Sequence, residues 1–309
     1  MRVVIVGPGA MGCLFSALFT KKKQAEVWLL DNQPQRAKKI NNQGIIVEGL
    51  GQTFNQKVNI TSQIKDIPPS DLVILCVKSY DTESAIKKIK PLLSGDTNVL
   101  TLQNGLGNIE MIAEIVGKDK VLGGVTANGA TLLGDGHIRF CGQGETVIGK
   151  VDGLLSVPMR GIREIFNKSG FSTRLSKDIN GIIWSKLIIN VGINALTALT
   201  RLTNGQLIES PGTREILSQA VTEAVKIAKK KRIKLIYDDP IQKVESVCKA
   251  TASNLSSMLQ DILNKKITEI DCINGAIVRQ GKSLGIATPA NLILTDLVKA
   301  IESVYLPKN

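Results

Sequence analysis

Apolar and polar residues alternate along the first half of the chain in a way typical of strands separated by helices. Runs of β-favouring apolar residues at positions 3–6, 71–77 and 98–102 are each followed by a stretch with apolar residues at helical spacing. The alternation continues for about 170 residues. It predicts an α/β domain whose parallel sheet is covered by helices on both faces.

Beyond residue 175 the pattern is helical, with no convincing strand. Residues 176–180 carry side chains that suit the start of a helix, so we place the domain boundary there. Two domains are therefore expected, residues 1–175 and an all-helical domain of residues 176–309. The helices expected in the second domain cover residues 179–200, 214–231, 240–258, 267–284 and 289–304.

A glycine motif joins the first strand to the first helix. Four apolar residues run straight into Gly-x-Gly-x-x-Gly, and an apolar helical pattern follows at once. In this context Gly7 permits a tight turn, Gly9 lets a pyrophosphate approach, and Gly12 lets helix and strand pack closely. The alternative is a glycine-rich turn without a ligand. The motif predicts a doubly wound, Rossmann-type fold with cofactor contacts at Gly7, Pro8, Gly9, Ala10, Met11 and Gly12.

The second predicted strand ends at an acidic residue. Asp31 follows residues 26–30 and lies 19 positions beyond Gly12. This spacing and residue type match the carboxylate that accepts a hydrogen bond from an adenosine ribose 2′-OH. Asp31 is therefore a second candidate contact for a dinucleotide.

Composition limits the class of protein. The 309 residues exceed a usual single domain, and 43% apolar with 21% charged residues is ordinary for a soluble globular protein. We find no apolar run of about 18 residues that would span a membrane. Met1-Arg2 leads directly into a strand, which leaves no room for a removable signal peptide. A cytoplasmic protein is expected.

Cysteine, histidine and charge exclude further classes. The five cysteines are scattered and odd in number, which indicates reduced thiols, and the single His137 cannot build a metal site alone, so no metal is expected. A net charge of +12 is compatible with nucleic acid, a membrane surface or anionic small molecules. The densest basic run, residues 226–234, has no interleaved aromatics and ends an amphipathic helix, so we expect neither nucleic acid nor membrane as a partner.

A polar stripe marks the first helix of the second domain. Lys186, Asn190 and Asn194 are four residues apart, so they share one helix face among Ile, Leu, Val and Ala. Polar groups in such surroundings need partners. Either the helix faces a cleft, where desolvation suits the lysine to give up a proton near neutral pH, or the stripe is an interdomain hydrogen-bond network.

A second group of polar residues lies between two later helices. Residues 253–261 and 265–275 bring together hydroxyls, an amide and carboxylates. Thr268 and Asp271 are also explained as helix-start residues, and Glu269 as a first-turn carboxylate, with no function required.

These motifs together give the chain a resemblance to a known family. The sequence is similar to ketopantoate reductase (2-dehydropantoate 2-reductase) over essentially its whole length. The resemblance implies reduction of 2-dehydropantoate to (R)-pantoate with NADPH, a step toward pantothenate and coenzyme A. It is carried by Gly7, Gly9 and Gly12, by residues 103–107, by the pattern from Trp184 to Leu199, by Asn204-Gly205, and by residues 256–261 with 269–275.

The resemblance also implies roles for single residues. Lys186 would be the general acid that gives a proton to the substrate carbonyl oxygen. Glu269 would bind the hydroxyl end of the substrate and Ser257 its carboxylate. Residues implied to orient the substrate are Asn190, Asn194, Asn204 and Asn254. Asn104 would lie beside the nicotinamide, and Lys78 matches a lysine that approaches the adenosine phosphate.

The chain departs from the family pattern at the end of the second strand. Many members carry an arginine there for the NADPH 2′-phosphate, whereas this chain has Asp31-Asn32. A carboxylate repels that phosphate and favours NADH. Arg36, Lys38 and Lys78 offer another cationic route, so we expect NADPH and leave NADH open.

Two other functions remain as alternatives. One is a related reductase or dehydrogenase of another 2-oxo or 3-hydroxy acid, which the Ser257 and Glu269 pair disfavours. The other is a non-catalytic nucleotide sensor, which has no use for the proton donor Lys186. We expect the active site in the cleft between the domains, a small 2-oxo acid as partner, and buried helical faces that would also suit a homodimer.

Overall fold

The chain forms two compact units in the computed structural model, which describes residues 1–49, 51 and 53–306. Unit 1 comprises Met1–Gln103 and Asn108–Ile179, and unit 2 comprises Asn104–Gly107 and Asn180–Asn309. The change of unit thus falls close to the expected boundary, and a short segment after Gln103 groups with the helical unit. The domain limits of 1–175 and 176–309 stay a prediction.

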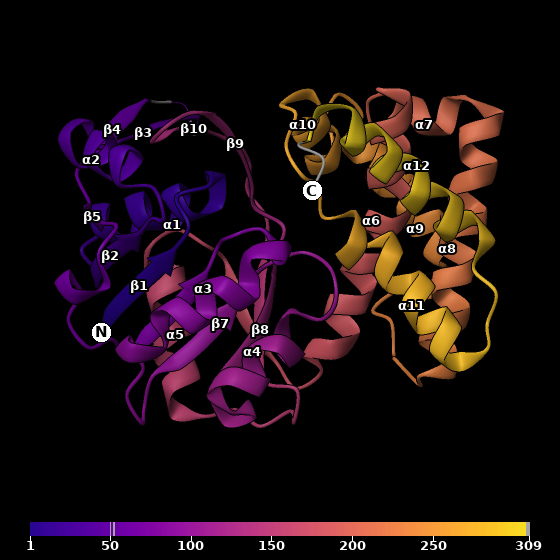
Figure 1. Ribbon diagram of the computed structural model, residues 1–309. Coiled ribbons are helices and arrows are strands. Elements are labelled where there is room, and N and C mark those ends of the chain that lie inside the picture. Colours follow the sequence, from indigo (N-terminus) through magenta and orange to yellow (C-terminus); the bar gives the residue numbers. More distant parts are fainter. Residues whose placement is uncertain (50, 52, 307–309) are drawn as a thin grey trace. The chain divides into compact units, whose positions relative to one another are not determined.

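Unit 1 is built on an eight-stranded sheet (Figure 1). Neighbouring strands are parallel except for one pair, β8 and β11. The predicted parallel sheet is thus present with one antiparallel pair, which forms because the chain between β8 and β11 contains no crossover helix. In spatial order the strands are β12 (Thr173–Ser176), β11 (Thr146–Gly149), β8 (Val121–Thr126), β7 (Asn98–Thr101), β6 (Leu72–Leu75), β1 (Arg2–Val6), β2 (Glu26–Leu30) and β5 (Asn59–Thr61).

Helices cover both faces of this sheet, as the sequence predicts. On β1, Val3 and Ile5 pack with α1 (Ala10–Lys21), α2 (Pro34–Gln43) and α5 (Val157–Lys168). The alternate residues Val4 and Val6 pack with α3 (Thr82–Ile89) and α4 (Asn108–Val116). A strand buried on both faces explains why β1 reads as a continuous apolar run.

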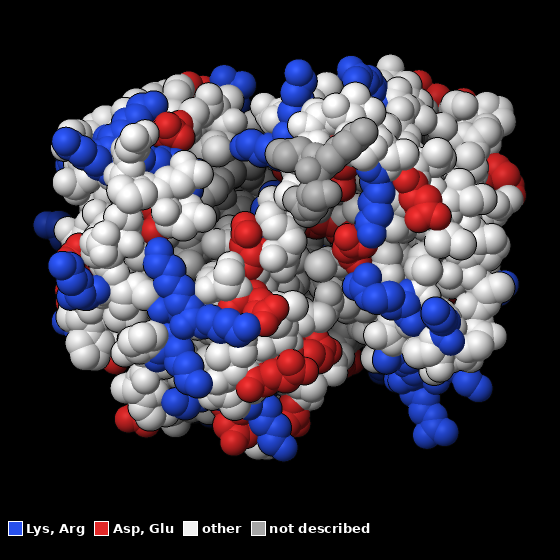
Figure 2. Space-filling model, viewed as in Figure 1, with Lys and Arg blue, Asp and Glu red and all other residues white. Residues whose placement is uncertain are grey.

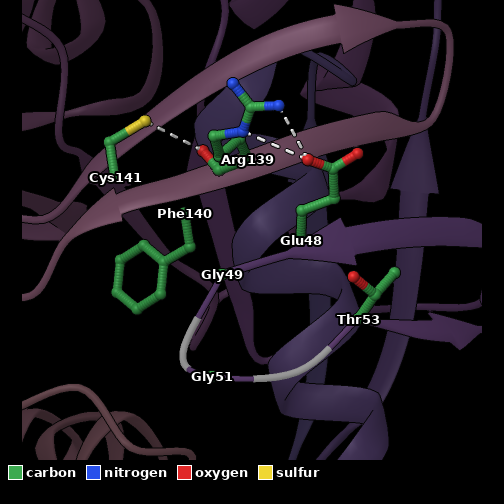
Figure 3. A pocket seen from close by; sticks show the side chains of 7 residues that line it. All are labelled: Glu48, Gly49, Gly51, Thr53, Arg139, Phe140 and Cys141. Carbon is green, nitrogen blue, oxygen red and sulfur yellow. Dashed lines mark hydrogen bonds and ion pairs between the residues drawn. The ribbon is translucent and has the colours of Figure 1, made fainter.

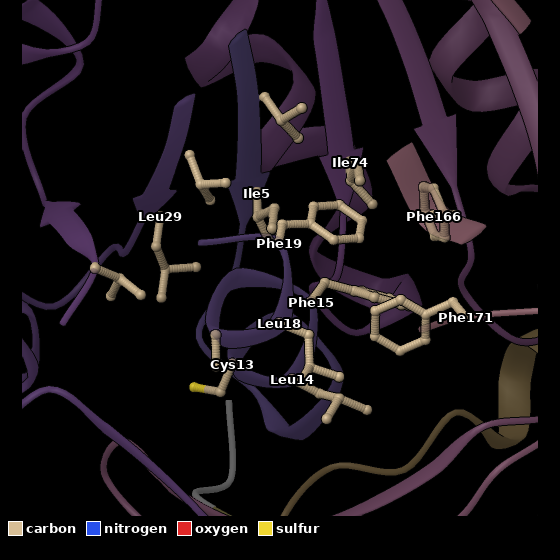
Figure 4. Packing of buried hydrophobic residues seen from close by; sticks show 14 of the residues in the cluster. Ile5, Cys13, Leu14, Phe15, Leu18, Phe19, Leu29, Ile74, Phe166 and Phe171 are labelled. Atoms are coloured by element: carbon tan, nitrogen blue, oxygen red, sulfur yellow. The ribbon is translucent and has the colours of Figure 1, made fainter. Parts of the chain in front are cut away.

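Four phenylalanines pack against one another in the core beside α1. Phe15, Phe19, Phe166 and Phe171 are fully buried and lie in edge or tilted arrangements, with Phe19 and Phe166 ring centroids 4.9 Å apart (Figure 4). Such ring pairs stabilise beyond their buried area. They join α1 to α5 and thereby fix the helix that starts at the glycine motif.

A small second sheet covers the other side of α1. It contains β4 (Phe54–Gln56), β3 (Ile45–Glu48), β10 (His137–Gly142) and β9 (Gly129–Gly134) in that order. Ile45, Val47, Ile138 and Phe140 join the core cluster of α1. The alternation of strands and helices along the sequence does not indicate a separate second sheet, because β3 and β10 pair across a long stretch of chain.

Unit 2 is all-helical. The expected helix over residues 240–258 is wrong as one element, because the chain leaves the helix at Thr251 and Ser256 accepts a hydrogen bond from Leu259 N at the start of a new one. The expected start at residue 267 is also wrong, since a 3-10 turn, Ile270–Cys272, precedes the helix. The helices are α6 (Ile179–Thr200), α7 (Gln206–Glu209), α8 (Pro211–Lys230), α9 (Pro240–Ala250), α10 (Ser257–Leu263), α11 (Asn274–Leu284) and α12 (Pro289–Tyr305). Unit 1 holds further 3-10 turns at Ile64–Asp66, Ser79–Asp81, Lys90–Leu92 and Lys118–Lys120.

Among the described residues, one helix is apolar enough to span a membrane by length and composition alone. It is α6, with a mean hydropathy of 1.6 over its most apolar window, which corrects the expectation that no such run exists. Of that window, 72% is buried inside the protein. Its apolar residues pack against α8, α9, α11 and α12, so α6 is the central core helix of unit 2.

We expect Phe166→Ala to destabilise unit 1 by about 3–5 kcal/mol, because it removes a fully buried ring from the phenylalanine cluster. Urea unfolding followed by circular dichroism measures the change. Val157→Ala on the same helix is the control, since Val157 is 77% exposed and should leave the free energy of unfolding almost unchanged. Equal effects of the two substitutions would contradict the role of the cluster.

Candidate functional site

The glycine motif adopts the conformation that its three glycines make possible. Gly7 has φ +101° and donates its N–H to the Leu30 carbonyl at 2.9 Å, which ties the turn to the end of β2. A Cβ on Gly12 would lie 2.0 Å from the Gly7 carbonyl oxygen, so α1 packs against the turn only with glycine there. Gly7 and Gly12 are therefore required by the fold itself.

Gly9 differs from the other two because space is open beside it. A Cβ there would have Cys76 O, at 3.8 Å, as its nearest neighbour. Gly9 is the N-cap of α1, which has no side-chain cap and no acidic residue in its first turn. Main-chain N–H groups and the positive helix end are thus left for an anion, which fits the pyrophosphate of a dinucleotide.

The order of the parallel strands agrees with this interpretation. In the sheet, β1 and β6 are neighbours. From β1 the chain order continues to β2 and β5 on one side, and from β6 it continues to β7 and β8 on the other. Ligands of such sheets bind at the carboxyl ends of the strands where the order reverses. Asp31 follows β2, and the half-buried Lys78 follows β6, so both candidate residues lie at that edge.

Asp31 does not present a free carboxylate. Its side chain is fully buried, with Arg36 Nε 2.7 Å from Oδ2 and Arg36 Nη2 2.5 Å from Oδ1. The main-chain N–H of Gln33 also donates to Oδ1, at 3.0 Å. The carboxylate is therefore occupied by an arginine of α2.

In unit 2 the stripe on α6 is only partly buried. Lys186 and Asn190 are half-buried, whereas Asn194 is 5% exposed. Desolvation lowers the pKa of Lys186 to about 8, and the attraction of the Glu269 carboxylate opposes that shift. A lysine with this pKa exchanges a proton near neutral pH.

Within unit 2, Glu269 interacts both with Asn104 and with Lys186. Asn104 Nδ2 lies 3.4 Å from Glu269 Oε2, and Glu269 is 6% exposed. The segment Asn104–Gly107 is fixed because Leu106 N donates to Cys272 O at 2.9 Å, and a Cβ on Gly105 would lie 2.4 Å from that oxygen. These residues from three chain segments form one polar cluster.

The remaining candidates form a second group in unit 2. Asn204 N donates to Asn254 O at 3.0 Å, and Asn204 Nδ2 donates to Thr251 Oγ1 at 2.9 Å. Asn204 Oδ1 is buried and has no hydrogen-bond partner among the described residues. Ser257, at the start of α10, and Asn254 are exposed. Asn204 thus offers an acceptor that the fold does not use.

Tyr237 supports the helical turn of Lys186, and the sequence analysis did not identify it. Its hydroxyl donates to the carbonyl of Ser185 at 2.8 Å, and Ser185 Oγ accepts from Ile236 N at 3.0 Å. The only available signal is that Tyr237 is one of three tyrosines, in a segment without helical or strand periodicity. That signal does not reveal a contact with a helix so distant in the sequence.

A pocket of about 720 Å³ beside the small sheet has none of the candidate residues among its described lining residues. Across it, Arg139 Nη2 donates to Glu48 Oε2 at 2.9 Å, and Cys141 Sγ donates to Arg139 O (Figure 3). Among the described residues no cluster of His, Cys, Asp or Glu is suited to a metal ion. The pocket is lined by Glu48, Gly49, Gly51, Thr53, Arg139, Phe140 and Cys141.

The excess of Lys and Arg over Asp and Glu does not form one continuous patch on the face shown in Figure 2. On the face in Figure 2, Lys and Arg side chains are interrupted by Asp and Glu. The densest run lies at the C-terminal end of α8, where Lys229 and Lys230 are in the last turn and Lys231 donates to Gln280. Cations at this position interact favourably with the helix dipole.

Two family models match the chain. The model described as Ketopantoate reductase PanE/ApbA matches residues 3–153, and Ketopantoate reductase PanE/ApbA C terminal matches residues 178–302. The chain belongs to the ketopantoate reductase family. It is accordingly an oxidoreductase of that family with a nucleotide-binding N-terminal region, and the family implies a nicotinamide cofactor and a small 2-oxo acid substrate.

Individual relatives of the family extend over the whole chain. The 2-dehydropantoate 2-reductase of Halobacterium salinarum is 36% identical over 97% of this chain and 98% of that protein. A PanE/ApbA family ketopantoate reductase from Ralstonia eutropha is 33% identical, with a TM-score of 0.91 and 99% of each chain covered. D-mandelate dehydrogenase, solved with NADH and anilino(oxo)acetate, is 28% identical, also with a TM-score of 0.91 and 99% of each chain covered. The expected α/β unit followed by helices is confirmed.

We expect Lys186 to titrate with a midpoint near pH 8. Competitive acylation at a series of pH values, read by peptide mass spectrometry, measures this midpoint. Glu269→Gln should lower the Lys186 midpoint further, since the carboxylate favours the ammonium form. An upward movement of the midpoint in this variant would contradict the balance of the two effects.

Proposed function

We propose that the chain reduces 2-dehydropantoate to (R)-pantoate with NADPH, with Lys186 as the general acid. The observation that carries the proposal is the half-buried Lys186, whose pKa is lowered to about 8 beside Glu269, in a chain of the ketopantoate reductase family. The nicotinamide supplies the hydride. Everything else in the reaction depends on how this chain holds the ketone and supplies a proton.

Lys186 suits the proton step on physical grounds. Reduction of a ketone places negative charge on its oxygen, and an ammonium beside that oxygen both stabilises the charge and donates the proton. An acid with a pKa near the working pH is charged before the step and gives its proton up readily. The apolar surroundings on α6 supply this pKa, while Glu269 keeps the ammonium form populated.

Polar side chains of unit 2 would hold the substrate. We assign the distal hydroxyl to Glu269 and the carboxylate to Ser257, with Asn190, Asn194, Asn204 and Asn254 orienting the substrate and Asn104 beside the nicotinamide. Support comes from the hydrogen bond between Asn104 and Glu269 and from the unpartnered Asn204 Oδ1. Buried groups without a partner discriminate against substrates that cannot satisfy them. On the cofactor side we assign the pyrophosphate to residues 7–12 and a phosphate contact to Lys78.

A second candidate is reduction of a different 2-oxo acid with NADH. It is favoured by the likeness to D-mandelate dehydrogenase, whose structure holds NADH and anilino(oxo)acetate. The assay that separates the two measures loss of NADPH or NADH absorbance with 2-dehydropantoate and, separately, with phenylglyoxylate. Preference for 2-dehydropantoate supports the first function. Preference for phenylglyoxylate supports the second, and no turnover of either by folded, nucleotide-binding protein supports a sensor.

The remaining proposals concern the setting of the enzyme. The five cysteines are free in the structure, in keeping with a cytoplasmic protein in a reducing compartment. A 2-oxo acid is the proposed small-molecule partner, and a homodimer stays a prediction that light scattering would test.

Lys186→Met should lower kcat for 2-dehydropantoate about a hundredfold or more, because the proton donor is removed while most of the side-chain volume remains. The dissociation constant for NADPH should change less than twofold. In the unaltered enzyme, kcat/KM for reduction should fall as the pH rises above about 8, where Lys186 loses its proton, and the variant should lack this fall. Steady-state kinetics and a cofactor titration measure these quantities.

Lys226→Met is the matched control, because Lys226 is exposed on α8 and should leave kcat and its pH profile unchanged. The assignment of Lys186 fails if Lys186→Met weakens NADPH binding as much as it lowers kcat.

Glu269→Gln should reduce kcat/KM for 2-dehydropantoate at least tenfold more than for 3,3-dimethyl-2-oxobutanoate, which lacks the distal hydroxyl. The effect of Glu269 on the Lys186 pKa acts on both substrates, so the ratio of the two isolates the contact with the hydroxyl. Competition assays at one pH measure this ratio. An unchanged ratio of the two kcat/KM values would show that Glu269 does not bind the distal hydroxyl.

A further inference from the structure

The end of β2 is the part of a dinucleotide fold that distinguishes NADH from NADPH. A free carboxylate there accepts hydrogen bonds from the ribose diol, whereas a nearby arginine accommodates a 2′-phosphate. This chain carries both residue types, Asp31 after β2 and Arg36 in the first half of α2. The residue type at position 31 alone therefore does not decide the cofactor.

The contacts of Asp31 argue against a role in binding the ribose. An ionised carboxylate has about four lone-pair positions. Three N–H groups already donate to Asp31, two from Arg36 and one from Gln33 N, and the side chain has no exposed surface. A ribose diol would have to displace Arg36 to reach these oxygens.

Arg36 has the opposite properties. Its Nε and Nη2 form a fork with Asp31, and the side chain keeps 25% of its surface exposed. Nη2 also donates to Asn32 Oδ1 at 3.4 Å, whereas Nη1 has no hydrogen-bond partner among the described residues. A guanidinium fixed along one edge presents its other N–H groups in a plane, which is the geometry that binds phosphate.

The pair lies next to the glycine motif. Gly7 N donates to the carbonyl of Leu30, the residue directly before Asp31. Arg36 and Asp31 both act electrostatically on the thiol of Cys13, in the first turn of α1, and Cys13 Sγ donates to Pro8 O. The guanidinium is therefore beside the turn whose main chain would face the pyrophosphate, where the adenosine ribose follows.

We propose that Arg36 selects the 2′-phosphate of NADPH and that Asp31 is the clamp that orients Arg36, not the acceptor of the ribose diol. The proposal rests on the proposed function for the presence of a nicotinamide cofactor. Arg36 neutralises the Asp31 charge, which reduces its repulsion of a phosphate. The arginine that many family members carry at position 31 is replaced here by one presented from α2.

The test uses adenosine fragments that need neither substrate nor turnover. Isothermal titration gives dissociation constants of the full chain for 2′,5′-ADP and for 5′-AMP, and then for NADPH and NADH. We expect the unaltered protein to bind 2′,5′-ADP at least tenfold more tightly than 5′-AMP. Arg36→Gln should remove most of this preference by weakening 2′,5′-ADP, and should leave 5′-AMP equal or tighter because Asp31 becomes available.

Two further variants keep the test interpretable. Arg36→Lys retains the charge but cannot form the fork with Asp31, so it should keep only part of the preference. Arg163→Gln removes one exposed arginine from α5 and controls for net charge, so it should leave both constants unchanged. Thermal unfolding of each variant shows that the protein remains folded.

The proposal is overturned if the unaltered protein prefers 5′-AMP and NADH, or if Arg36→Gln leaves the ratio of the two fragments unchanged. These outcomes differ from failure of the proposed function. Turnover of 2-dehydropantoate with a preference for NADH would overturn the role of Arg36 and leave the reaction standing. An Arg36-dependent preference for 2′,5′-ADP without turnover of 2-dehydropantoate would support the role of Arg36 and overturn the reaction.

Discussion

A buried carboxylate on α8 holds the helical unit together around its central helix. Glu223 accepts hydrogen bonds from Ala290 N, Asn291 N and Asn291 Nδ2, and so satisfies the first N–H groups of α12. Asn274 Nδ2 extends the network from Asn291 Oδ1 to the carbonyl of Val191 on α6. Leaving buried polar groups of this kind unpaired costs free energy, so these hydrogen bonds favour the observed arrangement of α6, α8, α11 and α12. The polar stripe of α6 has a fixed environment because of it.

The chemistry of Lys186 follows from that fixed environment. On an exposed helix the same lysine would stay charged at every physiological pH. Here desolvation lowers the pKa of Lys186 and the Glu269 carboxylate raises it, and desolvation has the larger effect. Tyr237 adds a support from outside the helix, since its hydroxyl binds the carbonyl of the residue before Lys186. The pKa of Lys186 is thus set by packing and by one carboxylate together, and these act in opposite directions.

The spacing of apolar residues was enough to predict helices and strands that are determined by neighbouring residues in the sequence. The bounds of α6 agree with the expected residues 179–200, and β1 with its glycine turn was evident because strand, turn and helix follow one another in sequence. The small sheet was not predictable, since the paired residues of β3 and β10 lie far apart in the sequence. The break between α9 and α10 was missed because Thr251 and Ser256 end and start helices through side-chain hydrogen bonds that apolar spacing does not show. For the site, the sequence indicated Lys186 and Glu269 as separate candidates. Their electrostatic interaction follows only from the packing of the folded unit.

Asp31 shows why a residue type at a motif position is an incomplete argument. Its spacing from Gly12 is that of a ribose acceptor, and the fold does place it at the end of β2. The spacing does not show that the side chain of Arg36, on α2, contacts Asp31. Because Arg36 donates two hydrogen bonds to it, the Asp31 carboxylate is not an exposed negative charge. It is the buried partner of an ion pair with Arg36. The electrostatic character of this edge is then determined by the group left facing outward, and that group is a guanidinium.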